Sequence, residues 1–174
     1  LEGTARDYGL EVDEQVDERY HVVKSTYAAC DYLRDAYERF GDWTLVAAAY
    51  NAGQNRIEEE LELQMVDNYY DLYLNEETSR YVFRVLAIKT IFNHPTDYGF
   101  HLKVEDLYPP IPTREVKVEE NIDDLRAFSL ELGINYRILK ELNPWLRKDE
   151  LTINGREEYI ILIPEKRFLR KNDL

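Results

Sequence analysis

The chain has 174 residues, of which 44% are hydrophobic and 13% aromatic, so it can bury a core and is not predicted to be disordered. Its formal net charge of -13 excludes nucleic acid as a partner, because phosphate binding requires clustered Lys and Arg side chains that this sequence lacks. No apolar run is long enough to span a bilayer, and no signal peptide is recognisable.

The first residue is Leu1 and the only methionine is Met65, so we expect a processed product or a piece of a longer protein. The single cysteine, Cys30, excludes an internal disulfide. Its alanine-rich helical surroundings predict that Cys30 is a small buried side chain.

The N-terminal third is predicted to be helical with one irregular interruption. Residues 1–10 have helical character, and residues 11–20 are acidic and irregular. Ser25 and Thr26 are predicted to cap the next helix. Its apolar residues recur at intervals of three and four and indicate a core-facing stripe: Ala29, Leu33, Ala36, Tyr37 and Phe40.

Residues 40–53 hold the end of one helix, the start of another and a polar turn. Gly41 can adopt the left-handed conformation that closes a helix, and Asp42 can cap the short alanine-rich helix after it. Tyr50 and Asn51 stand at the end of that helix, directly before Ala52 and Gly53. A polar pair at this position predicts groups that face a cleft.

The rest of the chain is predicted to be a helical part, a linker and a small module. One or two helical turns are expected over 57–63, a tyrosine-rich connector over 65–74, and an amphipathic helix over 76–93 with Tyr81, Val85, Ile88 and Phe92 on one face. After the Pro-rich stretch, strands over 115–118 and 159–163 enclose helices over 122–132 and 136–142. We therefore predict an α+β chain with a domain over 1–107, a linker over 108–113, a β-α-α-β module over 114–165 and a charged tail over 166–174.

Metal, cofactor and nucleophile chemistry find no support in the sequence. The three histidines, His21, His94 and His101, have no ligand spacing, so we predict neither a metal site nor a cofactor. The 7 glycines form no phosphate-binding loop. The 35 carboxylates follow no spacing rule that would select a catalytic pair.

Residues 1–99 contain a series of short motifs, which occur in this order: Thr4-Ala5, Tyr8-Gly9-Leu10, Asp17-Glu18-Arg19, Ser25-Thr26, Ala28-Ala29, Tyr32-Leu33, Phe40-Gly41-Asp42-Trp43, Ala49-Tyr50-Asn51-Ala52-Gly53, Glu77-Thr78 and Tyr81-Val82. In order and spacing this stretch resembles the catalytic domain of the membrane-bound lytic murein transglycosylase D family. The resemblance implies a lysozyme-like, goose-type helical fold. It also implies cleavage of peptidoglycan between N-acetylmuramic acid and N-acetylglucosamine, which leaves a 1,6-anhydro end.

The same resemblance implies roles for individual residues. The family's catalytic glutamate lies in a Glu-Ser motif upstream of the position matched by Thr4, so we expect it before Leu1 and expect this chain alone to be inactive. Tyr50, Asn51 and Tyr81 are implied to bind substrate, and Glu77 is implied to hold structure. The resemblance implies that the parent protein lies in the periplasm or cell envelope, with an outer-membrane anchor as one arrangement.

The second part, about residues 114–164, resembles a LysM domain, a β-α-α-β binder of peptidoglycan and chitin. Leu142-Asn143-Pro144 and Ile163-Pro164 carry this resemblance. It implies possible glycan contacts at Asn121, Asn143 and Pro144. A packing role against the first domain is the alternative for this module.

We therefore predict a fragment of a peptidoglycan lytic transglycosylase whose partner is the glycan strand. The alternative is a non-catalytic peptidoglycan-binding or scaffold protein. A helical-repeat protein is disfavoured because no internal repeat is visible. Since a piece without its catalytic helix would expose apolar surface along residues 47–50, we also expect possible self-association.

Overall fold

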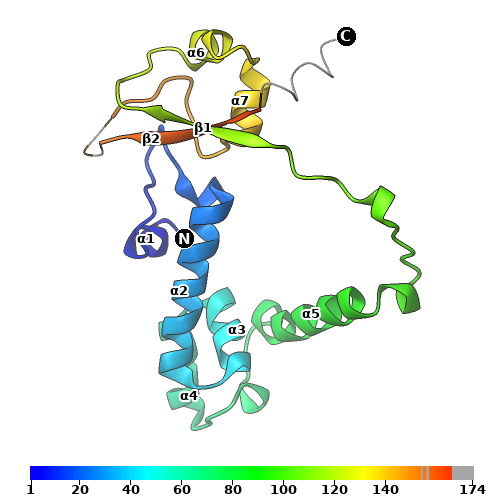
Figure 1. Cartoon of the computed structure of the whole chain (residues 1–174). Coiled ribbons are helices and arrows are strands. Elements are labelled where there is room, and N and C mark those ends of the chain that lie inside the picture. Colours follow the sequence, from blue (N-terminus) through cyan, green and yellow to red (C-terminus); the bar gives the residue numbers. More distant parts are fainter. Residues whose placement is uncertain (154, 156, 166–174) are drawn as a thin grey trace. The chain divides into compact units, whose positions relative to one another are not determined.

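The computed structural model describes residues 1–153, 155 and 157–165, and its elements are labelled in Figure 1. The chain divides into two compact units, Leu1–Ala29 with Pro109–Leu174, and Cys30–Tyr108, and each is described by itself. The domain boundaries expected from the sequence differ from this division and stay a prediction. None of the described helices combines the length and apolar character needed to cross a membrane.

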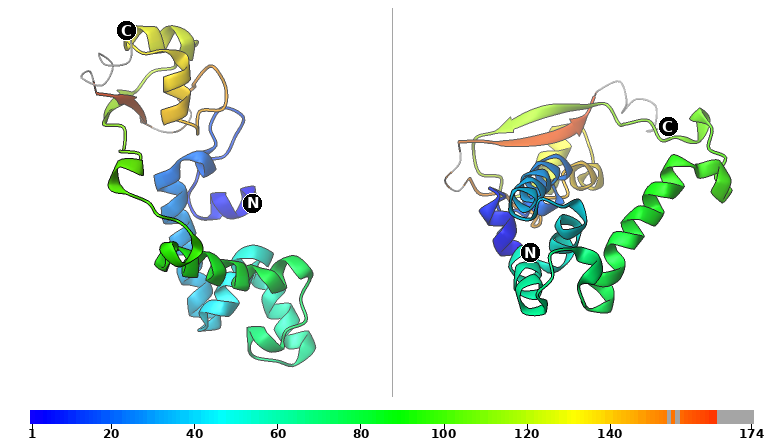
Figure 2. Two further views of the ribbon diagram at one scale, coloured as in Figure 1. Left: turned by 90° about the vertical axis from the view of Figure 1, so that its right-hand side faces the viewer. Right: turned by 90° about the horizontal axis from the view of Figure 1, so that it is seen from below.

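The unit Cys30–Tyr108 is built from helices. It contains the later turns of α2 (Val22–Phe40), then α3 (Trp43–Ala52), α4 (Gln54–Gln64) and α5 (Glu76–Asn93), with short 3-10 turns at Tyr69–Asp71, Pro95–Tyr98 and Val104–Asp106. Helix α3 contacts both α4 and α5, as Figure 2 also shows. The core consists of Leu45, Ala48, Ala49, Ile57, Tyr69, Leu72 and Val82.

The helix boundary before α3 follows the local prediction. Gly41 has φ 66°, which allows α2 to close in the left-handed region. The Asp42 carboxylate accepts hydrogen bonds from the backbone N–H groups of Thr44 and Leu45, both at 2.9 Å. These two bonds satisfy donors that the first turn of α3 would otherwise leave unpaired, so the predicted cap is confirmed.

The predicted start of α2 is wrong. The helix begins at Val22, and the hydroxyls of Ser25 and Thr26 donate back to the Val22 carbonyl at 3.3 and 2.6 Å. Ser25 also donates its backbone N–H to the His21 carbonyl. Hydroxyls that bond the preceding turn are compatible with a helix interior, which explains why these residues do not mark its first turn.

The connection from α3 to α4 is a single residue, Gly53, with φ 97° and ψ 141°. Helix α4 then runs for 11 residues and is longer than the one or two turns expected. A side chain is disfavoured at such a φ, because its Cβ would crowd the backbone. Glycine therefore lets the chain turn from Asn51 directly into the next helix.

Gly53→Ala is expected to destabilise the chain by about 1–3 kcal/mol, the usual cost of a residue held in a sparsely populated backbone region. Nothing lies within 4 Å of a Cβ built on Gly53, so the cost comes from the backbone and not from a clash. Urea unfolding measures it. Gly3→Ala is the matched control, because Gly3 lies inside α1 (Glu2–Asp7) with open space around it and alanine favours a helix. Equal stabilities of the two variants would contradict the assignment.

The unit Leu1–Ala29 with Pro109–Leu174 contains a two-stranded sheet and two short helices. Strands β1 (Thr113–Val118) and β2 (Tyr159–Pro164) pair antiparallel, as the two arrows in Figure 2 show. Thr113 lies opposite Pro164 and Val118 opposite Tyr159. Helices α6 (Leu125–Glu131) and α7 (Tyr136–Leu142) lie between them in the chain. The β-α-α-β order and the α+β class expected from the sequence are confirmed.

The first helix of this module is shorter than expected. It begins at Leu125 because the Asp124 carboxylate accepts the Arg126 backbone N–H at 2.8 Å and so caps it. Ile122 was expected to be helical, but it forms an isolated bridge with Leu151. Its backbone groups are thereby satisfied across the module and not along a helix.

Exposure differs from expectation in two places. Cys30, expected to be buried, is exposed. Within the stretch 47–50, where apolar surface was expected, Ala48 and Ala49 are completely buried and Tyr50 is exposed. Apolar surface also lies on α5, where Val85, Ile88 and Phe92 are among several exposed apolar side chains. Helix α5 thus has an apolar face with little cover, because its contacts with α3 use only its first turns, around Val82.

Candidate functional site

The polar residues at the end of α3 meet the first turn of α5. The Thr78 hydroxyl donates to Asn51 Oδ1 at 2.9 Å, and Asn51 Nδ2 donates to Glu77 Oε1 over a longer 3.4 Å. Asn51 is half-buried, Glu77 is exposed and Thr78 is only 2% exposed. The three side chains form one hydrogen-bonded row that joins two helices.

Tyr50 is positioned by α2. Its ring meets the ring of Tyr32 edge-on, with centroids 5.7 Å apart and an interplanar angle of 80°, which is a favourable aromatic geometry. The Tyr32 hydroxyl donates to the Ala49 carbonyl at 3.0 Å. Burial raises the pKa of the Tyr32 phenol, although hydrogen bonding with Gln54 acts against it. Tyr32 is therefore a neutral, anchored ring that supports an exposed Tyr50.

Tyr81, the third expected substrate contact, lies three residues after Thr78 on α5 and is half-buried. Residues three apart on a helix share a face, so Tyr81 and Thr78 are neighbours on the helix surface. The substrate-binding assignment of Tyr50, Asn51 and Tyr81 stays a prediction.

Sequence reasoning missed the two supporting residues, Tyr32 and Thr78. Both stand inside the family-like motifs quoted above, but a motif does not say which of its members touch across helices. Thr78 adjoins Glu77 in the first turn of α5 and precedes Tyr81 by three residues. Only the packing of α5 on α3 reveals that its hydroxyl reaches Asn51.

The start of α4 is tied to α2 by Arg39. Its guanidinium forms an ion pair with Glu58 and donates to Asn55 Oδ1 at 2.9 Å. Hydrogen bonding from Arg39 lowers the pKa of the Glu58 carboxyl. These contacts hold the first turns of α4, directly after Gly53, against α2.

The LysM-like module uses Asn143 for its own fold. Asn143 is completely buried, and its Nδ2 donates to the carbonyls of Leu139 at 2.9 Å and Leu162 at 2.7 Å. Its Oδ1 accepts the Leu162 backbone N–H at 2.7 Å. The carboxamide thus pairs with both backbone groups of Leu162 on the side of β2 away from β1, as a neighbouring strand would. Its role in glycan binding stays a prediction that these contacts do not favour.

The other two expected glycan contacts of the module lie nearer the surface. Asn121 is exposed and its Oδ1 accepts the Ile153 backbone N–H at 2.8 Å. Pro144 is half-buried, and its carbonyl accepts from Arg147 at 3.2 Å. Asn121 also lines an open cavity of about 640 Å³ formed by residues 117–124 with Ala127, Phe128 and Glu131. Of the three residues, Asn121 has the best access to a ligand.

The acidic segment before α2 packs into the LysM-like module. Val16 forms an isolated bridge with Leu146, and the backbone N–H of Asp17 donates to the Trp145 carbonyl at 2.9 Å. Val16 is 2% exposed and belongs to the module core, which also contains Val118, Leu125, Ile134, Leu139, Trp145, Leu146, Leu151, Tyr159, Ile161 and Ile163. Residues expected to be irregular therefore complete a hydrophobic core more than 100 positions away in the sequence.

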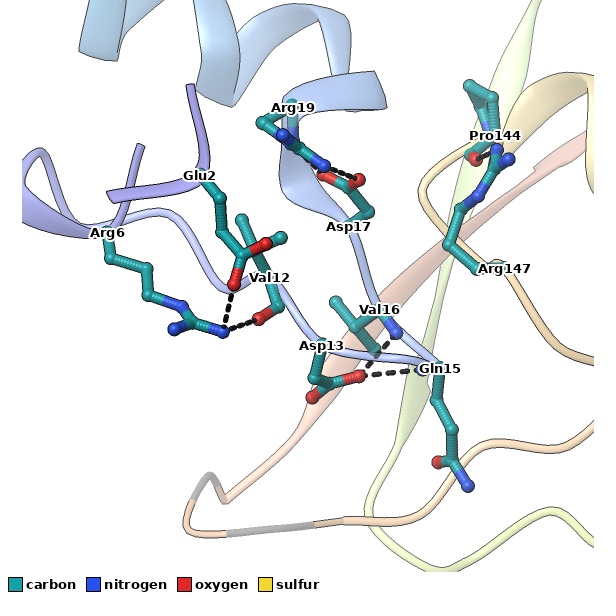
Figure 3. A network of polar contacts seen from close by, with 10 residues as sticks. All are labelled: Glu2, Arg6, Val12, Asp13, Gln15, Val16, Asp17, Arg19, Pro144 and Arg147. Atoms are coloured by element: carbon teal, nitrogen blue, oxygen red, sulfur yellow. Dashed lines mark hydrogen bonds and ion pairs between the residues drawn. The ribbon is translucent and has the colours of Figure 1, made fainter. Parts of the chain in front are cut away.

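Polar contacts hold this segment in shape (Figure 3). The Asp13 carboxylate accepts the backbone N–H groups of Gln15 and Val16 at 2.7 and 2.8 Å, which turns the chain toward Leu146. Asp17 pairs with Arg19 at 2.6 Å, and this hydrogen bonding lowers the pKa of Asp17. Arg6 joins Glu2 to the Val12 carbonyl.

Aromatic rings also contribute to the contact between the segment before α2 and the LysM-like module. Trp145 stacks between His21, at a centroid distance of 6.2 Å, and Tyr159, at 5.6 Å. Burial lowers the pKa of His21, which favours the neutral form of its ring. The Arg147 guanidinium lies 4.2 Å from the centre of the Tyr20 ring. These rings link the segment before α2 to the loop after Asn143.

One buried carboxylate lies near this contact. Glu18 is 1% exposed, and its carboxylate pairs with Lys24 at 2.5 Å and accepts the Glu11 backbone N–H at 2.8 Å. The Lys24 side chain is 44% exposed, so the buried carboxylate is paired with a cation that reaches solvent. Within the described part of the chain, no three His, Cys, Asp or Glu side chains come together as a metal site would require.

Known protein families match the chain in two separate parts, one at each end of the sequence. Residues 1–72 match the family model described as transglycosylase SLT domain, and residues 114–167 match the soluble lytic transglycosylase C-terminal LysM-like domain. Two curated relatives named membrane-bound lytic murein transglycosylase D, from Escherichia coli K12 and Escherichia coli O6:H1, are each 28% identical over 171 residues. The alignment covers 95% of this chain but 37% of each relative. The resemblance stated from the sequence is confirmed.

Proposed function

We propose that the chain is a fragment of a peptidoglycan lytic transglycosylase. Its first part matches a transglycosylase SLT domain, and its last part matches the LysM-like C-terminal domain of soluble lytic transglycosylases. The chain spans less than two fifths of the curated relatives it matches, so the activity is that of the parent protein. The observation that carries the site assignment is the row of Asn51, Glu77 and Thr78, which supports a fixed amide donor at the end of α3.

In the proposed reaction this chain supplies a wall of the cleft and not the acid. A catalytic acid needs an apolar niche, whereas Glu77, the carboxylate that contacts Asn51, is exposed. We assign the acid to a glutamate that precedes residue 1 in the parent protein. That carboxyl protonates the glycosidic oxygen, the substrate's acetamido oxygen stabilises the anomeric carbon, and the carboxylate then takes the proton of the C6 hydroxyl as it attacks.

The roles of Asn51, Tyr50 and Tyr81 follow from that sequence of steps. An amide N–H fixed in position stabilises an acceptor whose charge changes in the transition state. Asn51 would donate to the acetamido group or to the catalytic carboxylate. Tyr50, held by Tyr32, and Tyr81, on the same face of α5 as Thr78, would contact the sugar near the cleaved bond.

We propose peptidoglycan as the partner and the cell envelope as the location, because the matched relatives are membrane-bound murein enzymes by name. The non-catalytic binder or scaffold is not favoured, because the SLT match covers the stretch that contains Tyr50 and Asn51. Self-association of the isolated chain stays a prediction. The exposed apolar side chains of α5 support it.

Asn51→Ala in the full-length parent is expected to lower kcat on purified peptidoglycan about a hundredfold, which is the usual effect of removing one transition-state donor. Mass spectrometry of the products measures turnover, because 1,6-anhydro ends lack the water that a hydrolase adds. Asn93→Ala, the same change at the far, exposed end of α5, is the matched control.

Two results would contradict the proposal. Unchanged kinetics of a folded Asn51→Ala protein would remove Asn51 from the cleft. Normal release of anhydro products by residues 1–174 alone would show that the acid lies within this chain.

A further inference from the structure

Thr78 is the buried polar side chain of the helical unit. Five buried polar or charged residues occur in the described part of the chain, namely Asp17, Glu18, Thr78, Ser129 and Asn143, and Thr78 alone belongs to Cys30–Tyr108. A buried hydroxyl without a partner would cost about 1–3 kcal/mol, so its hydrogen bond to Asn51 is an obligatory feature of the packing. This makes the direction of that bond informative.

The backbone around Thr78 is held from two sides. Asn75 caps α5, and its Oδ1 accepts the Thr78 backbone N–H at 2.9 Å. The buried Tyr69 hydroxyl donates to the Ser79 carbonyl at 2.7 Å and also lies 3.4 Å from the Thr78 carbonyl. The backbone that carries the Thr78 side chain is consequently held by Asn75 and Tyr69.

The Asn51 carboxamide can adopt two orientations that differ by a half-turn, and its two neighbours distinguish them. A carboxylate only accepts hydrogen bonds, so the side facing Glu77 must be the NH2 group. The carbonyl then faces Thr78, whose hydroxyl donates to it. The opposite orientation would place two acceptors, Asn51 Oδ1 and the Glu77 carboxylate, against each other.

The consequence is a defined donor. Asn51 Nδ2 carries two hydrogens and donates one of them to Glu77 Oε1 in a hydrogen bond of 3.4 Å. The second hydrogen is the one that a ligand oxygen, such as an acetamido carbonyl, would accept. If the carboxamide rotated, the ligand would meet a carbonyl in place of an N–H for part of the time.

We propose that Thr78 is a positioning residue that fixes the Asn51 carboxamide with its N–H toward the substrate. This inference rests on the function proposed above. Thr78 does not touch the substrate; it acts through Asn51. The kinetic effect should therefore follow the hydroxyl and not the volume of the side chain.

Two variants of the full-length parent separate these causes. Thr78→Val keeps the shape and removes the hydroxyl, and we expect it to lower kcat on purified peptidoglycan about tenfold with a smaller change in KM, since one hydrogen bond is lost and the transition state depends on it most. Thr78→Ser restores the hydroxyl and is expected to return kcat to within about twofold of the unaltered protein. Equal kcat values for Thr78→Val and the unaltered protein would overturn the proposal, as would equal losses in both variants.

A measurement on residues 1–174 does not depend on activity. In the ¹⁵N-labelled chain, the signals of the two Asn51 side-chain amide protons are assigned by their loss in Asn51→Ala. Thr78→Ser should preserve the chemical shifts of these two protons, and Thr78→Val should alter them. In the unaltered chain the Thr78 hydroxyl proton should exchange slowly and show a nuclear Overhauser contact to Thr78's neighbours in α3. A hydroxyl proton that exchanges at the solvent rate overturns the proposal even if no variant folds. If the spectra behave as expected but the parent releases no anhydro products, the proposed function fails and the positioning of Asn51 does not.

Discussion

Asn143→Ala is expected to lower the free energy of unfolding of the unit Leu1–Ala29 with Pro109–Leu174 by about 3 kcal/mol, because the N–H and C=O of Leu162 both lose their partner. The lost partner is inside a core where water cannot replace it, since Asn143 is completely buried. The Leu139 carbonyl is less affected because it also accepts the Asn143 backbone N–H.

Urea unfolding followed by Trp145 fluorescence measures this effect. Trp145 is 4% exposed inside the module, and replacing the other tryptophan, Trp43, by phenylalanine leaves Trp145 as the sole reporter. Asn121→Ala is the control. It removes one exposed hydrogen bond and should cost less than about 1 kcal/mol. A similar loss in both variants would mean that the Asn143 carboxamide does not hold the edge of β2.

Val16→Asp is expected to destabilise the same unit by about 4 kcal/mol, because it places an unpaired carboxylate in the module core. The red shift of Trp145 fluorescence should appear at much lower urea than in the unaltered chain. The result is informative because Val16 belongs to the SLT match whereas the core it enters belongs to the LysM-like match. It tests whether residues 11–21 are part of the module's fold.

Val23→Asp is the matched control for this prediction. Val23 is 58% exposed in the first turn of α2, where a negative charge is favoured by the helix dipole. Its effect should be within about 0.5 kcal/mol, as for most surface substitutions. If Val16→Asp were no more destabilising than Val23→Asp, the segment before α2 would contribute nothing to the module core.

Both predictions bear on what the LysM-like module does. The loop after Asn143 is covered by the segment before α2 through Val16, Trp145 and His21. The module therefore packs against residues 11–21, which belong to the same compact unit. A packing role against the first domain as a whole stays a prediction. Asn121 and the cavity that it lines are the place to look for a ligand of the module.

Local patterns predicted much of the fold. The bounds of α5 and α7 match the expected helices at 76–93 and 136–142, because Asn75 and Asn135 cap them and the apolar spacing continues to their ends. Asp42 caps α3 for the same reason. Local patterns gave the wrong helix start at Ser25 and the wrong structure at Ile122. The Ser25 hydroxyl bonds the Val22 carbonyl inside the helix, and Ile122 pairs with Leu151 in an isolated bridge.

Some features of the candidate site also follow from the sequence, and others follow only from the tertiary structure. The motifs around Tyr50 and Asn51 consist of consecutive residues, so the sequence by itself determined the family resemblance, the α+β class and the polar pair at the end of α3. The tertiary structure alone decided that Thr78 orients Asn51, that Asn143 serves β2 and that Val16 completes the module core. The physical reason is that each of these depends on which buried donor finds which acceptor, or which apolar side chain fills which space, between residues far apart in the chain. No local periodicity encodes that choice.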